Sequence, residues 1–98
     1  MVRIAWTPFS LDDLRAIRSF IARNAPRTAD AFVRRLIHAV RRLKRFPLSG
    51  SIVAEFGRAD IREILHGNYR IVYRVISAHV EILTVCHSAR QLSDDILP

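Results

Sequence analysis

Basic side chains alternate along one short stretch of the sequence, with an acid and a histidine close behind them. Arg70 and Arg74 are an even number of residues apart, and Glu81 and His87 follow after a polar break. Arginine forms bidentate contacts with phosphate or carboxylate, and histidine can gain or lose a proton near neutral pH. If these four side chains share a face, they form a cationic surface suited to an anionic partner.

The stretch that must position them, residues 60–90, has the composition of a β-sheet. It is rich in β-branched and aromatic side chains, which pack well in strands. Gly67-Asn68 tolerates positive φ where the chain first reverses, and Ser77-Ala78-His79 is a polar break of hairpin length. The pattern predicts three antiparallel strands joined by two tight turns.

The loop length after Ile76 decides which side chains share a face. A two-residue loop pairs Arg74 with Glu81, Val72 with Leu83, and Arg70 with Val85. Every even-numbered loop then groups Arg70, Arg74, Glu81 and His87, whereas an odd-numbered loop breaks the group. We predict that this group lies on a basic, open side of the sheet.

The opposite face of the middle strand carries mostly apolar side chains suited to packing under helices: Tyr69, Ile71, Tyr73 and Val75. Arg62 stays unassigned, because a two-residue Gly67-Asn68 loop places it with Tyr73 and a three-residue loop places it with Arg70.

The N-terminal half predicts a strand and two helices. Val2 to Trp6 is a short apolar run that ends at Thr7-Pro8. Ser10 and Asp13 resemble a helix start, and apolar spacing predicts helices over about 11–23 and 27–45 that form an antiparallel hairpin. A short strand over 51–56 is expected after the turn at 47–50, and the last residues predict a short helix or a frayed tail.

Composition bounds the function classes. Ninety-eight residues fit one domain over residues 1–98, and the single cysteine excludes an internal disulfide. No apolar run reaches the ~20 residues that cross a bilayer, so we expect a cytoplasmic protein without a membrane contact. The net charge of +7 favours a polyanion or an acidic protein. A general nucleic-acid-binding module is an alternative that only the net charge suggests, since the sequence lacks interleaved exposed aromatic residues. The arginines of residues 34–45 fit a solvated helix face or a partner surface equally well.

The chain resembles the RelE/ParE superfamily of bacterial type II toxin–antitoxin toxins over nearly its whole length. The order and spacing of several segments carry the resemblance: Trp6-Thr7-Pro8, Asp13-Leu14, Ile17, Phe32, Pro47-Leu48-Ser49-Gly50, Ile61-Arg62-Glu63, residues 69–74, and residues 80–87 running into Ala89-Arg90. The resemblance implies an α+β fold, in which a two-helix antiparallel hairpin packs on a mainly antiparallel twisted sheet, and no cofactor or metal.

The resemblance also implies a cognate antitoxin, with an acidic or amphipathic segment, and one of two targets. ParE-like toxins poison DNA gyrase, whereas RelE-like toxins cut mRNA on the ribosome without a metal. The absence of a tyrosine after Arg90 and of a lysine cluster in residues 51–58 favours gyrase and a protein that is not an enzyme.

Candidate site residues follow from motif positions in the family. For a nuclease, Arg70 would stabilise the scissile phosphate, His87 would act as acid or base, and Arg62 and Arg90 would contact phosphates. For a gyrase inhibitor, the target-binding patch would be Arg70, Arg74 and Arg90. The antitoxin would contact a set on the helices and strands: Leu14, Ile17, Phe32, Leu36, Arg62 and Arg74.

Overall fold

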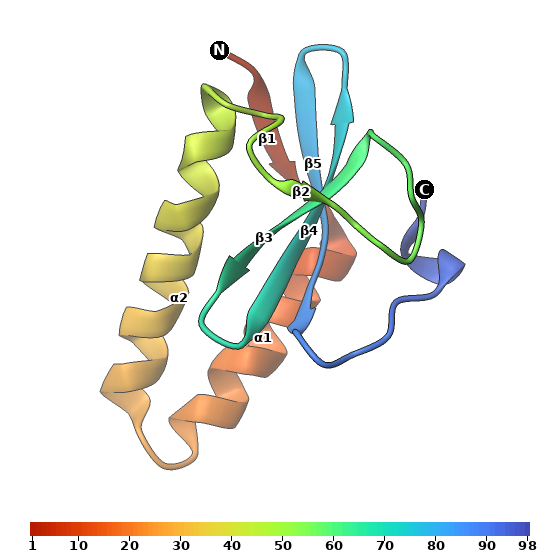
Figure 1. The fold of residues 1–98 in the computed structure, drawn as a ribbon. Coiled ribbons are helices and arrows are strands. Elements are labelled where there is room, and N and C mark those ends of the chain that lie inside the picture. Colours follow the sequence, from red (N-terminus) through yellow and green to blue (C-terminus); the bar gives the residue numbers. More distant parts are fainter.

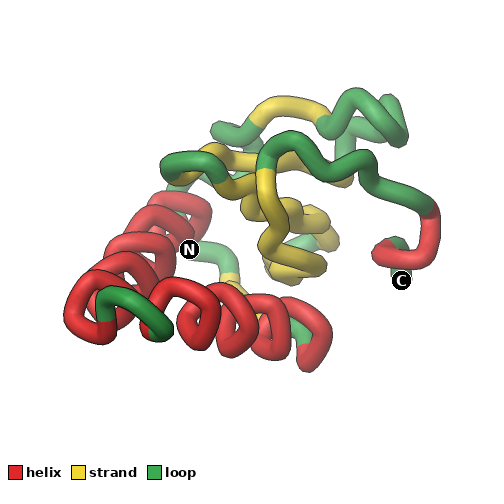
Figure 2. The backbone as a smooth tube through the Cα atoms, turned by 90° about the horizontal axis from the view of Figure 1, so that it is seen from below, coloured by secondary structure: helices red, strands yellow, loops and turns green.

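A computed structural model that describes residues 1–98 shows one twisted five-stranded sheet with a helical hairpin on one face (Figure 1). The predicted α+β class is confirmed. The elements follow in the order β1 (Arg3–Trp6), α1 (Pro8–Ala22), α2 (Pro26–Val40), the 3-10 turn η1 (Arg41–Lys44), β2 (Ser51–Ile52), β3 (Ile61–His66), β4 (Tyr69–Ile76), β5 (His79–His87) and the 3-10 turn η2 (Asp94–Ile96). Figure 2, seen from below, shows the two long helices at the left and bottom of the strands and the short turn near the C-terminus at the right.

The sheet has the strand order β1-β5-β4-β3-β2. The two predicted hairpins are present, because β3 pairs antiparallel with β4 and β4 pairs antiparallel with β5. Both loops are two residues long, with positive φ at Gly67 (57°) and Ser77 (47°). β1 adds to the other side of β5 in parallel, so the first and last strands of the chain lie side by side.

A register shift divides the β4–β5 hairpin into two parts. Arg74 pairs with Glu81 as predicted, but the register slips between Val72 and Tyr73, and beyond the slip Arg70 pairs with Cys86. The predicted pairs of Val72 with Leu83 and Arg70 with Val85 are therefore wrong. A bulge of this kind inserts one residue and reverses the faces of the side chains that follow it.

The side chain of Asp13 on α1 stabilises the irregular part of β5. Its Oδ2 accepts hydrogen bonds from Thr84 Oγ1 (2.5 Å) and from the backbone N–H of Val85 (3.0 Å). A ladder that slips leaves backbone groups without cross-strand partners, and buried groups of that kind are costly. Asp13 therefore accepts hydrogen bonds from β5 and does not stabilise the start of the helix as the sequence had indicated.

The first helix begins three residues earlier than predicted. Thr7 is its N-cap, with Oγ1 accepting from Ser10 N (3.2 Å), and Pro8 occupies the first turn. Ser10, predicted as the cap, is instead fully buried inside the helix, where its hydroxyl donates to Thr7 O (2.8 Å). The second helix starts at Pro26 and tightens into η1 after Val40. Neither helix has the length and apolar character that a membrane span requires.

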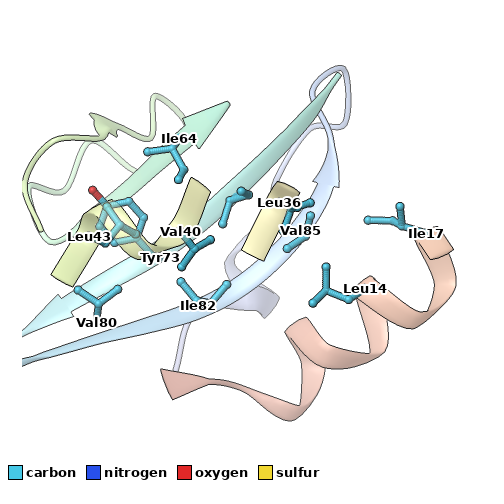
Figure 3. Packing of buried hydrophobic residues seen from close by; sticks show 11 residues of the cluster. Leu14, Ile17, Leu36, Val40, Leu43, Ile64, Tyr73, Val80, Ile82 and Val85 are labelled. Atoms are coloured by element: carbon cyan, nitrogen blue, oxygen red, sulfur yellow. The ribbon is translucent and has the colours of Figure 1, made fainter. Parts of the chain in front are cut away.

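The larger core cluster lies between the helices and the sheet (Figure 3). Its eleven buried members come from both helices, η1 and the three long strands: Leu14, Ile17, Leu36, Val40, Leu43, Ile64, Ile71, Tyr73, Val80, Ile82 and Val85. Tyr69 and Val75 pack against it from β4, which confirms the predicted dry face of the middle strand.

A second, smaller core cluster covers the opposite face of the sheet. Six buried residues form it: Val53, Ile61, Val72, Leu83, Cys86 and Leu92. Phe56 from the loop after β2, and Ile96 and Leu97 from the C-terminal segment, pack against them. The expectation of an open side is therefore wrong for this part of the sheet, because the loop and the tail cover it. β2 ends at Ile52, and so the strand predicted over 51–56 is shorter than expected.

The phenol of Tyr73 fixes the turn at residues 47–50. This fully buried side chain donates to Pro47 O (2.7 Å) and accepts from Gly50 N (3.0 Å). Gly50 has no room for a side chain, since an added Cβ would lie 2.5 Å from Glu63 O. The turn is thus held against the sheet by one hydroxyl and one close backbone approach.

We expect Tyr73→Phe to lower the free energy of unfolding by about 1–3 kcal/mol, because it leaves the buried N–H of Gly50 without an acceptor. Urea denaturation followed by circular dichroism measures the change. Tyr69→Phe is the matched control, since no hydrogen bond involves the Tyr69 hydroxyl. Equal stability of the two variants would contradict this role of Tyr73.

Candidate functional site

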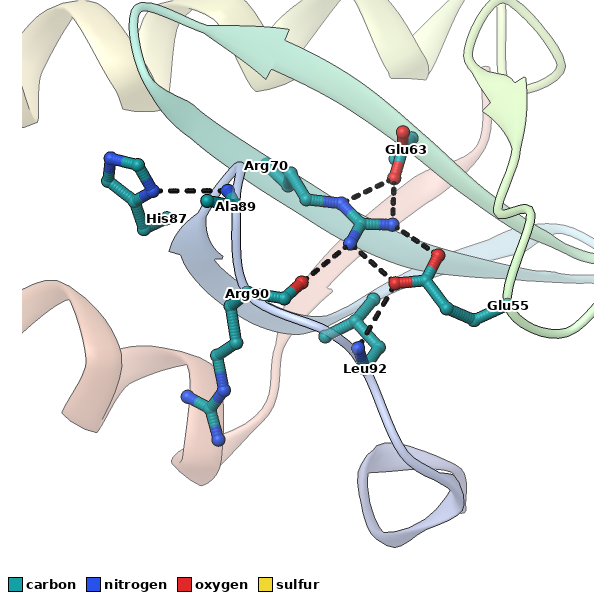
Figure 4. Close-up of polar contacts among 7 residues, drawn as sticks. All are labelled: Glu55, Glu63, Arg70, His87, Ala89, Arg90 and Leu92. Carbon is teal, nitrogen blue, oxygen red and sulfur yellow. Dashed lines mark hydrogen bonds and ion pairs between the residues drawn. The ribbon is translucent and has the colours of Figure 1, made fainter.

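Arg70 lies at the centre of a polar cluster on the face covered by the loop and the tail (Figure 4). Its side chain is 8% exposed. Nη1 and Nη2 contact the two carboxylate oxygens of Glu55 at 2.7 and 2.9 Å, and Nε and Nη2 contact Glu63 Oε1 at 2.7 and 2.6 Å. Nη1 also donates to the carbonyl of Arg90 (3.0 Å). A guanidinium has five N–H donors. Four hydrogen bonds and the ion-pair contact of Nη2 with Glu63 engage all three of its nitrogens.

The cluster joins three segments that are distant in sequence. Glu55 comes from the loop after β2, Glu63 from β3, and the carbonyl of Arg90 from the C-terminal segment. The second oxygen of Glu55 also accepts from the backbone N–H of Leu92 (3.0 Å). We call Arg70, Glu55 and Glu63, with the Arg90 and Leu92 backbones, the arginine clamp.

The electrostatics of the clamp favour the charged form of each partner. The hydrogen bonds from Arg70 lower the pKa of Glu55 from 4.5 to about 2, against the opposing effect of burial. The hydrogen bond with Glu55 likewise raises the pKa of Arg70 above its usual range. The guanidinium is thus neutralised by two carboxylates, and the clamp as a whole carries a net negative formal charge.

The surface above the clamp is a shallow depression. Its lining combines the clamp with loop and tail residues: Ala54, Glu55, Glu63, Leu65, Arg70, Ser88, Ala89, Arg90 and Gln91. The side chain of Arg90 points away from the clamp in Figure 4 and is exposed. Arg90 is thus the cation that this face offers to a partner.

His87 lies on the opposite face of the sheet from Arg70. Because of the register shift, His87 pairs with Tyr69, whose ring lies 6.0 Å from the imidazole. Tyr69 in turn contacts Phe32 of α2, which places Tyr69 and His87 on the face of the sheet that the helices cover. The predicted grouping of His87 with Arg70 and Arg74 is therefore wrong. His87 Nδ1 accepts from the backbone N–H of Ala89 (3.1 Å).

Arg74 and Arg62 occupy different environments. Arg74 lies 3.9 Å from both Asp60 and Glu81, and its Nε has no hydrogen-bond partner. The predicted cross-strand pair of Arg74 and Glu81 is confirmed, although their side chains make only a long contact. Arg62 pairs with Tyr73, as a two-residue loop requires, and donates to the carbonyls of Ala59, Leu48 and Gly50 at 2.9, 3.3 and 3.0 Å.

The residues predicted to meet an antitoxin divide by exposure. Leu14, Ile17 and Leu36 are buried in the larger core cluster, so they support the helical hairpin from within. Phe32 and Arg74 are half-buried and present some surface, and the guanidinium of Arg62 is engaged with backbone carbonyls.

Sequence reasoning missed the two acids of the clamp. Glu63 had a signal: with a two-residue loop at Gly67-Asn68, Glu63 pairs with Val72, which shares its face with Arg70. Glu55 had none, since it lies in a loop whose path depends on the covered sheet face. The clamp becomes visible only when the loop and tail are placed.

Three comparisons with known proteins agree on one superfamily. Residues 4–92 match the family model described as ParE toxin of type II toxin-antitoxin system, parDE. The curated Toxin RelE2 of Caulobacter vibrioides is 33% identical over 91 residues, which are 92% of this chain and 99% of the relative.

Two solved structures share the fold. The chromosomal ParDE toxin-antitoxin system of P. aeruginosa superposes with a TM-score of 0.76 at 20% identity, covering 89% of this chain and 96% of that one. The toxin-antitoxin complex RelBE2 of Mycobacterium tuberculosis gives a TM-score of 0.60 at 28% identity, over 91% and 93% of the two chains.

The clamp predicts a specific acid sensitivity. The pKa of Glu55 is lower in the folded state than the ordinary 4.5, so its stabilisation is present above pH 4.5 and is lost as the pH falls towards 2. One pKa unit corresponds to ~1.4 kcal/mol, so we expect a loss of a few kcal/mol at most. Glu55→Gln, which has no such proton to take up, should show a shallower loss between pH 4.5 and 2.

Urea denaturation at several pH values measures this dependence. Asp12→Asn is the control, because Asp12 makes only an exposed pair with Arg15 and should follow the wild-type pH profile. Parallel profiles for the wild type and Glu55→Gln would show that the clamp does not hold Glu55 in its charged form.

Proposed function

Since the chain belongs to the ParE family of type II toxin–antitoxin toxins, we propose that it arrests growth by inhibiting DNA gyrase until a cognate antitoxin binds it. The match to the ParE model spans residues 4–92. The alternative is ribosome-dependent mRNA cleavage, and the observation in its favour is the relative named Toxin RelE2.

The separation of Arg70 from His87 is the observation that carries the choice of gyrase. Metal-independent cleavage of RNA needs a base, an acid and a cation gathered around one phosphate. Here Arg70 and His87 lie on opposite faces of the sheet, and the donors of Arg70 are occupied by Glu55, Glu63 and Arg90 O. The pair that would form a nuclease centre therefore does not converge, which supports binding over catalysis.

In this proposal the target-binding surface is built from Arg74 and Arg90, with Arg70 as its support. Arg90 is exposed, and its backbone carbonyl is fixed by Arg70 (3.0 Å). Arg74 is 29% exposed and has only long contacts to acids, at 3.9 Å, although its unpaired Nε is itself buried. Both guanidinium groups are thus able to form new ion pairs with a target protein without breaking a strong one.

We further propose that the antitoxin neutralises the toxin by covering part of the same surface. The two structural relatives are a ParDE system and a RelBE2 complex. The antitoxin would contact Phe32 and Arg74, with Leu14, Ile17 and Leu36 holding the helical hairpin beneath and Arg62 holding the turn at 47–50. Because Arg74 belongs to both sets, the antitoxin and gyrase would compete for it.

We expect the purified wild-type chain to inhibit gyrase supercoiling and to leave ribosome-bound mRNA intact. Arg90→Ala should raise the concentration needed for half inhibition about 5- to 20-fold, because it removes an exposed cation from the interface. His87→Ala is the matched control, since His87 lies on the other face and should leave inhibition unchanged. A side-by-side supercoiling assay and ribosome-dependent cleavage assay measures both activities.

The same assays can reverse the assignment. Cleavage of mRNA by the wild type that is abolished in His87→Ala would establish the RelE-like activity instead. Growth arrest without any effect on supercoiling would also exclude gyrase as the target.

Arg74 provides a test of shared recognition. Arg74→Ala should weaken both antitoxin binding, measured by isothermal titration calorimetry, and gyrase inhibition, each by about 5- to 20-fold. Arg58→Ala is the control, because Arg58 is exposed and already paired with Asp60 at 2.8 Å. Loss of only one of the two interactions would mean that the two surfaces do not overlap at Arg74.

A further inference from the structure

The outer surface of α2 and η1 is an uncompensated cationic face. Residues 31–54 contain six Lys or Arg residues and no Asp or Glu. Six side chains of this segment define what we call the basic face, and all six are exposed: Arg34, Arg35, His38, Arg41, Arg42 and Arg45. None of them forms an ion pair, because the ion pairs of the chain involve other arginines.

The helical geometry collects these side chains in one arc. At about 100° per residue, Arg34, His38 and Arg41 fall within ~60° of one another, with Arg35 beside them, and the tighter η1 continues the basic face to Arg42 and Arg45. The buried residues of the same segment, Leu36, Val40 and Leu43, project from the other side into the larger core cluster. From Arg34 to Arg45 the row is roughly 19 Å long, at about 1.5 Å per residue in α2 and about 2.0 Å per residue in η1.

The basic face is accessible and hollowed. In Figure 1, α2 lies at the left edge of the molecule with no other element on its outer side. One hollow is lined by Arg34, Arg35, His38, Ala39 and His66, the last from the end of β3. A second hollow lies between Arg34, Ile37, His38 and Arg41. Arginine and histidine side chains border both hollows, and the N–H donors of arginine suit phosphate oxygens.

We propose that the basic face binds the phosphate backbone of double-stranded DNA. This binding is additional to gyrase inhibition and does not depend on it. Like charges placed together without acids repel one another, and a polyanion relieves that repulsion while releasing its own counterions. Charge complementarity is thus the main driving force of the interaction.

The composition of the face disfavours a protein partner. Protein interfaces have a desolvated centre of aromatic or apolar anchors surrounded by polar residues. On the basic face only Ile37 is apolar and exposed, and it is 37% exposed. A surface of arginines without such a centre matches phosphate contacts better, because those are made by basic side chains along a backbone.

The form of nucleic acid follows from shape. Single strands are bound by stacking on several exposed aromatic side chains, whereas residues 34–45 contain no Phe, Tyr or Trp, and the exposed Phe46 lies just beyond them. The B-DNA major groove is wide enough to admit an α-helix, so a protruding basic helix reaches phosphates on its edges. The major groove of A-form RNA is deep and narrow and excludes such a helix. Duplex DNA is therefore the favoured occupant.

Fluorescence anisotropy of a labelled 20-base-pair DNA duplex tests this proposal with the full chain alone. We expect the logarithm of the association constant to fall linearly with the logarithm of the salt concentration. The slope should be about −3 if three to four phosphates are contacted. The double variant Arg34→Gln with Arg41→Gln should bind roughly 10- to 100-fold more weakly at 50 mM salt, with a slope shallower by about 2.

The control is Arg15→Gln with Arg23→Gln, which removes the same charge from exposed positions on α1 and at its C-cap. Circular dichroism verifies that both double variants fold. The control should bind within about threefold of the wild type, because its residues lie outside the basic face. Equal weakening of the two variants would overturn the proposal, since it would mean that net charge alone attracts DNA.

Competition with unlabelled polyanions tests whether another ligand binds the basic face better than duplex DNA. Unlabelled DNA duplex should displace the probe at lower concentration than an RNA duplex, a single strand or polyglutamate of equal charge. Preference for any of these three would overturn the assignment to duplex DNA. Because gyrase is absent from the experiment, its failure would leave the proposed gyrase inhibition untouched, and failure of gyrase inhibition would leave the DNA result standing.

Discussion

The ion pairs of Arg70 are the constraint on which the second face of the sheet depends. Burying a guanidinium and two carboxylates costs several kcal/mol per ion unless the charges are paired and hydrogen-bonded, and here Arg70 makes four hydrogen bonds and a further ion-pair contact from Nη2 to Glu63. The loop after β2 and the C-terminal segment reach the sheet through these contacts, and Leu92 is buried beside them. Loss of one carboxylate would leave a buried charge unpaired, so the loop, β3 and the tail hold one another in place.

A single inserted residue in β5 determines which chemistry the two faces can support. With an unbroken register, Arg70, Arg74 and His87 would line one surface. The shift between Val72 and Tyr73 instead moves His87 to the helical side, next to Tyr69 and Phe32. The hydrogen bonds of Asp13 to Thr84 and Val85 stabilise this arrangement from α1. The contact between helix and sheet thereby separates two groups that a nuclease would need together.

The sequence predicts the parts of this fold that local chemistry controls. The β-branched runs predict the strands, Gly67-Asn68 predicts a turn, and Pro26 predicts the start of the second helix. Each of these residues acts through its own backbone preferences. The bulge was not predictable from strand parity, because it depends on Asp13, 71 residues before Thr84. The prediction that Ser10 caps the first helix was wrong for a similar reason. Thr7 caps the helix instead, with Pro8 in the first turn, and Thr7 is held there because its hydroxyl also donates to Ile82 O (2.8 Å) in the neighbouring strand.

The composition likewise predicts the net charge, but it does not predict which basic side chains are left unpaired and exposed to a partner. The excess of arginine suggested a cationic patch on the sheet, yet Arg70 is neutralised by Glu55 and Glu63. The acids of the chain all lie within residues 12–30 and 55–95, whereas residues 31–54 have none. Because exposed like charges weaken compactness and gain nothing from the fold itself, their concentration on α2 and η1 calls for an external anion. The densest group of exposed, unpaired basic side chains therefore lies on α2 and η1, away from Arg70, the arginine that the sequence pattern emphasised.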